Sequence, residues 1–228
     1  MKNFKSLFFT LLIILPTSGQ KIKEEILANA MLNMDEFIEF LSLPNDANVK
    51  DDIDRLIDWT ERKFQSLNFD IKLLDTDTFP LMLAEKKVNN SSKTILIYLH
   101  LDGQPIDVSK WDQEDPFSPV FKISNNNSFS VINWDSIKDL SFDQLESKDV
   151  RIFARSSSDA KGPVMMIIQA LKFMELNDID QRFNIKLIMD FEEEKSSPSL
   201  PFAVEKYKDL LKSDALLIFD GPQHESGI

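Results

Sequence analysis

The sequence predicts an α/β sandwich with a largely parallel central sheet. Three short apolar runs, at residues 94–99, 184–191 and 215–219, have the length and the side-chain types of strands that are buried on both faces. Amphipathic helix patterns accompany these runs along the chain. Strands that alternate with helices are typical of parallel sheets covered by helices.

The first twenty residues are predicted to be a secretory signal peptide. Lys2 and Lys5 give a positively charged start, residues 7–15 form an apolar core, and small and polar residues follow up to residue 20. The apolar core is too short to span a bilayer. We therefore expect export to the periplasm or the extracellular medium and no stable membrane anchor. The alternative is an uncleaved anchor or a buried first helix.

The next part of the chain alternates helices and strands. Apolar residues at helical spacing predict two amphipathic helices that cover a sheet. Two short segments rich in apolar residues, with a turn between them, predict strands before the central strand. The expected helices are residues 21–43 and 51–67, and the expected strands are residues 69–74, 81–85 and 94–99.

The second half continues the pattern after a proline-punctuated loop at residues 104–120. Residues 124–147 are rich in Asn, Ser and Asp and are interpreted as a surface excursion without an assigned role. Pro163 is expected to open a buried helix, because proline suits the first helical position. The remaining expected elements are strands at 149–154, 184–191 and 215–219 and helices at 164–176 and 200–211.

Composition limits the possible chemistry. The formal net charge of −12 argues against a nucleic-acid partner, whose phosphates would be repelled. The chain has no cysteine, which excludes disulfides, thiolate metal sites and a cysteine nucleophile. His100 and His224 are the two histidines of the 228-residue sequence, so a metal site must rely on carboxylates.

Acidic residues and one histidine follow the ends of several predicted strands. Parallel strands would gather these side chains at one edge of the sheet, where open α/β sheets bind their ligands. Carboxylates that crowd together raise one another's pKa unless a cation balances them, and a pair of divalent metals would do so. Imidazole with carboxylate suits zinc, and manganese or cobalt are alternatives. Taken singly, His100 could be a solvated strand end and residues 192–194 a solvated charged face. The residues are His100, Asp102, Asp159, Glu193, Glu194 and Asp220.

Five motifs in one order resemble the di-zinc metallopeptidase family of carboxypeptidase G, carnosinase-like dipeptidases and aminoacylases. They are HLDGQP, WDQEDPF, RSSSDAKGP, DFEEEKSSPS and IFDGP. The resemblance covers about residues 26–222 and implies a zinc-exopeptidase-like three-layer sandwich, incomplete at its carboxyl end. It makes residues 21–228 the amino-terminal part of the catalytic domain, without the lid domain, the final catalytic segment and the last metal-ligand histidine.

The same resemblance assigns roles to the clustered residues. It implies two divalent metal ions, with His100 and Asp220 on one ion, Glu194 on the other, and Asp159 bridging both. It makes Asp102 the acid that orients His100 and Glu193 the general base. If the register of the acidic run shifts by one residue, Glu192 and Glu193 take the roles of Glu193 and Glu194.

Three positions depart from the family pattern, and His224 has no family role. Ala154, Ser156 and Ser196 stand where the family usually has glycine. These changes reduce backbone freedom near the expected metals but leave the expected ligands in place. His224 is interpreted as a surface histidine.

The expected function is metal-dependent hydrolysis of a peptide or amide bond in a small substrate, of the dipeptidase or carboxypeptidase type. The alternatives are an N-acyl amino acid deacylase and a non-catalytic binding member of the same fold. The substrate would be a small peptide or an N-acyl amino acid, and a homodimer through the lid domain is compatible with the resemblance. The 228 residues alone are expected to be inactive and poorly soluble, with an exposed apolar sheet edge.

Overall fold

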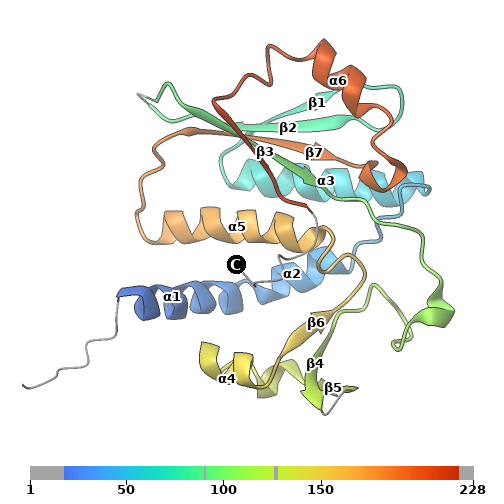
Figure 1. Ribbon diagram of the computed structural model, residues 1–228, viewed down its shortest axis with the longest axis vertical. Helices are drawn as coiled ribbons and strands as arrows, with labels where there is room; N and C mark the ends of the chain where they lie inside the picture. Colours follow the sequence, from blue (N-terminus) through green and yellow to red (C-terminus); the bar gives the residue numbers. More distant parts are fainter. Residues whose placement is uncertain (1–17, 90, 126–127, 221–228) are drawn as a thin grey trace, which may run out of the picture.

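The computed structural model describes residues 18–89, 91–125 and 128–220 (Figure 1). Its helices are α1 (Ser18–Leu32), α2 (Met34–Leu41), α3 (Lys50–Ser66), α4 (Phe142–Ser147), α5 (Lys161–Leu176) and α6 (Leu200–Lys206), with short 3-10 helices at Val108–Lys110, Trp134–Ser136 and Glu193–Lys195. Its strands are β1 (Asp70–Leu74), β2 (Leu81–Lys86), β3 (Thr94–His100), β4 (Val120–Asn125), β5 (Ser128–Ile132), β6 (Arg151–Phe153), β7 (Asn184–Asp190) and β8 (Ala215–Ile218).

The central sheet has five strands in the order β1-β2-β7-β3-β8. The strand β3 runs parallel to both β7 and β8, whereas β2 is antiparallel to β7 and β1 is antiparallel to β2. Helices α3 and α5 lie on one face of the sheet and α6 lies on the other (Figure 1). The predicted α/β sandwich of three layers is therefore confirmed, and its parallel pairs lie where the predicted buried strands meet.

Each face of the sheet has its own apolar core, because successive strand residues point to opposite faces. Leu99 and Met189 belong to the core that also contains Phe64 of α3 and Ile168 of α5. The other core includes alternate residues of the same strands and residues near α6, namely Leu96, Ile188, Ala203 and Leu211. Strands β3 and β7 are thus packed on both faces, as their unbroken apolar sequences indicated.

The predicted first helix, residues 21–43, is two helices. α1 ends at Leu32 and α2 begins at Met34, and Asn33 between them has φ −106° and ψ 14°, outside the helical region. The Asn33 side chain donates to the carbonyl oxygen of Asn29 at 2.7 Å and accepts from Lys172 at 2.7 Å. These side-chain hydrogen bonds give the local backbone an alternative to the helical pattern, which apolar spacing does not reveal.

Two other helix boundaries differ from the prediction. α5 begins at Lys161, two residues before Pro163, so the proline occupies the third helical position rather than the first. That position still tolerates proline, because the first turn has no intrahelical acceptor for its N–H groups. α6 ends at Lys206 instead of residue 211, and turns formed by hydrogen bonds to Tyr207 follow it.

The interpretation of residues 124–147 as a surface excursion was incomplete, because most of this segment is regular structure. β4, β5 and β6 form a separate antiparallel sheet in the order β5-β4-β6, with α4 beside it. A few aromatic contacts hold it, including a stacked pair of Phe121 and Trp134 with centroids 4.8 Å apart. The predicted strand at 149–154 is β6 of this small sheet, so it is not part of the parallel sheet.

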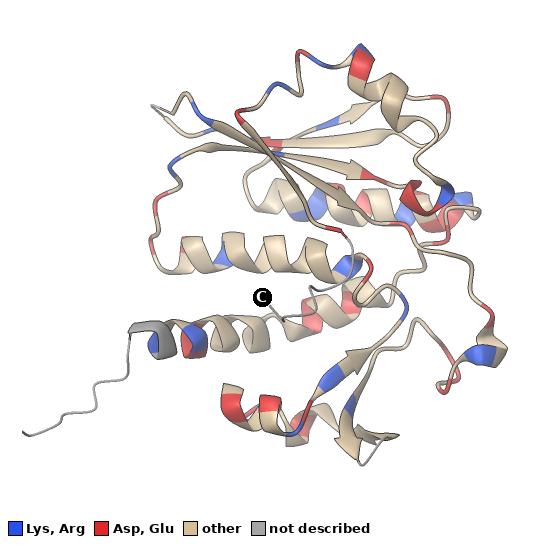
Figure 2. Cartoon of the chain, viewed as in Figure 1, with Lys and Arg blue, Asp and Glu red and all other residues tan. Residues whose placement is uncertain are grey.

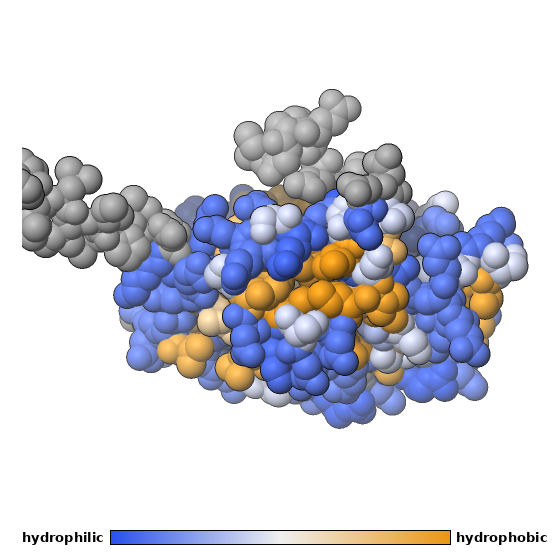
Figure 3. Space-filling model, turned by 90° about the horizontal axis from the view of Figure 1, so that it is seen from below, coloured by the Kyte–Doolittle hydropathy of each residue, from blue (hydrophilic) through white to orange (hydrophobic). Residues whose placement is uncertain are grey.

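The predicted third buried strand, residues 215–219, is an exposed edge strand. Leu216, Leu217 and Ile218 of β8 are 55%, 45% and 63% exposed. Within the described residues β8 pairs with β3 alone, which agrees with the expected apolar sheet edge. Apolar side chains also gather into a patch on the face of the molecule seen in Figure 3.

The predicted signal peptide, residues 1–20, falls almost entirely outside the described residues, which begin at residue 18. α1 starts at this same residue. In the described part of the chain, every helix is too short or too polar to cross a membrane.

Shortening one side chain in the buried centre of the sheet tests this packing. Leu99→Ala in β3, where Leu99 is 0% exposed, should lower the free energy of unfolding by about 2–5 kcal/mol, because it removes buried apolar surface and leaves a cavity. Leu73→Ala on edge strand β1, where Leu73 is 45% exposed, is the matched control and should cost less than about 1 kcal/mol. Equal losses for the two variants in urea titrations would contradict the two-faced burial of β3.

Candidate metal centre

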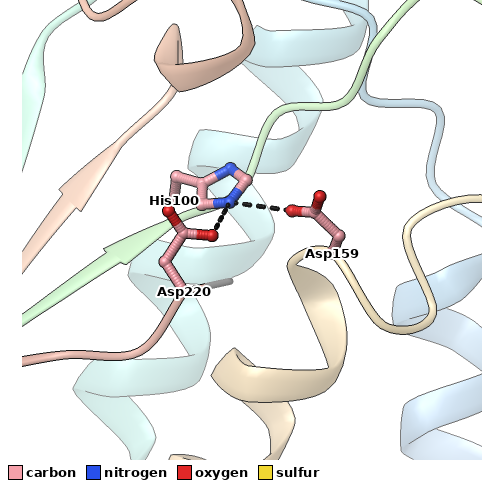
Figure 4. A group of neighbouring side chains, drawn as sticks. All are labelled: His100, Asp159 and Asp220. Atoms are coloured by element: carbon pink, nitrogen blue, oxygen red, sulfur yellow. Dashed lines mark ion pairs between the residues drawn. The ribbon is translucent and has the colours of Figure 1, made fainter. Parts of the chain in front are cut away.

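A histidine and two aspartates from three separate segments meet at the carboxyl edge of the parallel strands. His100 is the last residue of β3, Asp159 precedes α5, and Asp220 lies two residues beyond β8. Figure 4 shows the imidazole of His100 between the two carboxylates. His100 is 0% exposed, whereas the Asp159 side chain is 65% exposed, so the group is buried on one side and open on the other.

The distances in this group are short enough for one cation to reach all three side chains. His100 Nε2 lies 3.0 Å from Asp159 Oδ1 and 3.4 Å from Asp220 Oδ1. One ligand atom from each residue lies within 4.8 Å of the others. Neither ring nitrogen of His100 has a hydrogen-bond partner among the described residues. A buried polar atom without a partner is costly, so the geometry fits a bound cation at Nε2.

Asp102 connects this group to the loop that follows β7. It is 0% exposed, and its Oδ1 lies 3.5 Å from His100 Nδ1. Its two carboxylate oxygens also accept the backbone N–H groups of Glu193 and Glu194, each at 3.0 Å. One buried carboxylate therefore lies beside the imidazole and holds the start of the acidic loop by two hydrogen bonds.

The three consecutive glutamates, residues 192–194, lie in three different environments. Glu193 Oε2 lies 3.9 Å from His100 Nδ1, beside the group. Glu194 lies outside the His100 group, and its Oε2 accepts a hydrogen bond from Gln104 Nε2 at 2.8 Å. Glu192 is 2% exposed, and its carboxylate accepts a hydrogen bond from the hydroxyl of Thr78.

Electrostatics at this edge favour a cation. Figure 2 shows acidic residues where β3 and β7 end. Burial lowers the pKa of His100, but the neighbouring carboxylates, Asp102 first among them, outweigh burial and raise that pKa to about 9. Burial raises the pKa of the Glu193 carboxyl, and the charge of His100 opposes this shift while nearby carboxylates add to it.

The expectation that parallel strands deliver every one of these residues was wrong for Asp159. His100, the 193–194 pair and Asp220 do follow β3, β7 and β8 of the central sheet. Asp159 follows β6, which belongs to the small antiparallel sheet, and the loop from residue 154 to 160 carries it to the group. Strand order therefore explains only part of this cluster, and the loop supplies the rest.

Two of the positions that replace a family glycine have the backbone conformation that glycine favours. Ser156 has φ 58° and Ser196 has φ 68°, both in the left-handed region. The third, Ala154, is 6% exposed. The two serines thus keep the loop geometry at some conformational cost, since a Cβ is disfavoured there.

A cleft of about 290 Å³ opens beside the group, and its lining includes Asp159 and Glu194. This volume lies near the lower end of the range for small-molecule pockets. Gln104, Trp111 and Arg155 also line it, and the sequence prediction gave them no role. All three stand in or beside the quoted motifs, HLDGQP, WDQEDPF and RSSSDAKGP, and that was the signal available for them.

Comparisons with known proteins identify dipeptidases and carboxypeptidases as relatives. No family model matches the chain. Human Beta-Ala-His dipeptidase is 29% identical over 143 residues, which are 62% of this chain and 23% of that protein. The Cys-Gly metallodipeptidase dug1 of Schizosaccharomyces pombe is 29% identical over 145 residues, which are 62% of this chain and 25% of that protein.

A solved structure gives the same result for the fold. The M20 family metallo-carboxypeptidase of Sulfolobus solfataricus matches with a TM-score of 0.67 and 29% identity, over 86% of this chain and 38% of that one. The chain thus spans well under half the length of the relatives that it matches. These similarities confirm the resemblance to metallopeptidases that the five motifs indicated.

Asp102 is the residue whose loss should disturb the site most directly. Asp102→Asn should lower the free energy of unfolding by about 2–3 kcal/mol, because two backbone N–H groups lose a charged acceptor. The matched control is Asp107→Asn, since Asp107 also accepts a backbone N–H, from Ser109, but in an exposed position. Calorimetry should show a clear fall of Tm for the first variant and almost none for the second, and similar curves would contradict the assigned contacts.

Proposed function

We propose that this chain, a relative of the M20 metallopeptidases, hydrolyses peptide or amide bonds in small substrates with the help of divalent metal ions. The observation that carries this proposal is the buried imidazole of His100, whose Nε2 faces carboxylates from two other segments. The names of the relatives, a dipeptidase, a metallodipeptidase and a metallo-carboxypeptidase, support the same reaction class.

We propose that the site holds two ions and that the metal is zinc. His100, Asp159 and Asp220 would hold the first ion, since imidazole nitrogen and carboxylate oxygen are common zinc ligands. Asp159 would be shared with the second ion, together with Glu194, which lines the same cleft. Manganese and cobalt accept similar ligands and are the alternatives. A bound metal would lower the pKa of a water and polarise the substrate carbonyl.

Side chains of the protein would orient the metal ligands and transfer the proton of the attacking water. Asp102, close to Nδ1 of His100, would fix the ring so that Nε2 points outward to the carboxylates. Glu193 would accept a proton from the attacking water and later donate it to the amine that leaves. The pKa of the Glu193 carboxyl is raised, first by burial, so this group holds a proton more readily than a free carboxyl does.

The geometry favours Glu193 over Glu192 as the base. Glu193 lies beside His100, whereas the carboxylate of Glu192 is buried against Thr78. Of the carboxylates in the described residues that lie within ion-pair distance of His100, none belongs to Glu192. The register with Glu193 as base and Glu194 as ligand is therefore the one that we propose.

The substrate is proposed to be a dipeptide or another short peptide. The cleft of about 290 Å³ beside Asp159 suits a small molecule better than a folded protein. A deacylase would act on an N-acyl amino acid by the same proton transfers, so a panel of dipeptides and N-acetyl amino acids separates these two substrate classes. A binding member of the fold would hold such molecules without turnover.

Substitution of each of the two neighbouring glutamates, in separate variants, tests which of them is the base. Glu193→Gln in the full-length protein should lower kcat about 10²–10⁴-fold, because proton transfer to and from the reacting atoms is lost. Glu192→Gln should leave kcat within about tenfold of the parent, since that carboxylate would be structural. The reverse order of the two losses, measured on the same dipeptide, would show that the register is shifted by one residue.

Removal of the histidine tests the metal site without an assay of turnover. His100→Ala should abolish binding of the first ion, because the remaining carboxylates lose their buried nitrogen partner. Asp135→Asn is the control, since the Asp135 side chain is 77% exposed in the 3-10 helix Trp134–Ser136. Metal content after dialysis against zinc, read by atomic emission, should fall for the first variant alone. Unchanged zinc in His100→Ala would overturn the proposed ligand set.

A further inference from the structure

The connection between α2 and α3, residues 42–49, lies against both segments that carry the proposed ligands. Asp46 forms an isolated parallel bridge with Gly103, and the N–H of Gly103 donates to the carbonyl oxygen of Asn45 at 2.8 Å. Gly103 is three residues beyond His100. This connection therefore extends the hydrogen bonding of the chain just after β3 ends.

The side chain of Asn45 reaches both segments at once. Its Nδ2 donates to the carbonyl oxygen of Leu101 at 2.8 Å and to Ser156 Oγ at 3.0 Å. Leu101 follows His100 directly, and Ser156 stands three residues before Asp159. Asn45 is 1% exposed, and a buried amide whose hydrogen bonds are satisfied restricts its partners to one arrangement.

The contact is tight as well as polar. A Cβ placed on Gly103 would lie 2.7 Å from Ser156 Oγ and 3.0 Å from the amide atoms of Asn45. No side chain fits between the two segments there, so a glycine is required by the close approach itself. Ser156 holds its left-handed φ of 58° at this point, with its hydroxyl against Asn45.

Lys161 makes a second connection from the other side of Asp159. It is 0% exposed at the start of α5, and its Nζ donates to the carbonyl oxygen of Phe40 at 3.0 Å and to that of Leu43. Phe40 lies in the last turn of α2, and Leu43 lies in the connection just beyond it. The segment that contains Asp159 is thus hydrogen-bonded to residues 40–45 both before the aspartate, through Ser156, and after it, through Lys161.

We propose that Asn45 and Lys161 are positioning residues that set the separation of His100 and Asp159 for metal binding. Neither residue belongs to the proposed ligand set; each acts through the backbone of the segment that carries a ligand. The inference rests on the proposed function, because the property that it sets is metal affinity. It adds to that function a support from α2 and the 42–49 connection, far from the ligands in sequence.

A variant of each residue tests this support. Asn45→Ala and Lys161→Met should each weaken zinc binding about 10–100-fold, as expected when groups that orient metal ligands are lost. Thr60→Val is the matched control, because the fully buried Thr60 hydroxyl also donates to a backbone carbonyl, that of Leu56 at 2.7 Å, but within α3. Zinc affinity is measured by competition with a chelator in the full-length protein, at a temperature where all variants are folded.

The control separates positioning from a general loss of stability. If Thr60→Val lowers Tm as much as Asn45→Ala and keeps its zinc affinity, destabilisation does not explain the weaker binding. Equal zinc affinities for Asn45→Ala and the parent, or an equal loss in Thr60→Val, would overturn the inference.

Hydrogen exchange of the metal-free protein keeps this test independent of the proposed function. The amide of Gly103, which donates to Asn45, and that of Lys161, which donates to Ser156 at 3.0 Å, should exchange faster together in Asn45→Ala. They should be unchanged in Thr60→Val. If the parent binds no zinc, the proposed function fails, whereas unchanged exchange of Lys161 in Asn45→Ala shows that the two segments are not joined.

Discussion

Parallel pairing of β3 with both β7 and β8 is the constraint on which the arrangement of the site depends. In this register His100 stands opposite Asp190, and Tyr98 stands opposite Ile218. Two residues beyond that last pair, the chain of β8 reaches Asp220 at the level of His100. In this register alternate apolar side chains of β3 and β7 enter the two cores, one on each face of the sheet.

The charges gathered by this register shape the chemistry of the edge. A fully buried imidazole lies among the carboxylates of Asp102, Asp159 and Asp220, with Glu193 beside them. Carboxylates so close together repel one another, and the single histidine can balance only one of them by taking a proton. A divalent cation balances more charge and satisfies the imidazole nitrogen too, so metal binding and stability of this edge are expected to be coupled.

Polar contacts from elsewhere in the fold hold the loops on which this cluster depends. Asp102 fixes the 193–194 loop through two backbone N–H groups, and Asn45 ties the segment after β3 to the loop before α5. Such networks are demanding, since every buried donor and acceptor must find its partner. The serines at positions 156 and 196, in a glycine-like conformation, belong to the same closely fitted loops.

The sequence by itself determined the layers, most strands and which polar residues gather at one edge of the sheet, because buried strands and their polar ends leave a local pattern. Unbroken apolar runs identified β3 and β7, and the residues after the strands identified His100, Glu193 and Asp220 as neighbours. Only the tertiary structure decided that residues 149–154 join a second sheet, that β8 is exposed, and that Asn45 reaches both site segments. Those outcomes depend on contacts between residues up to 111 positions apart, which no local pattern encodes.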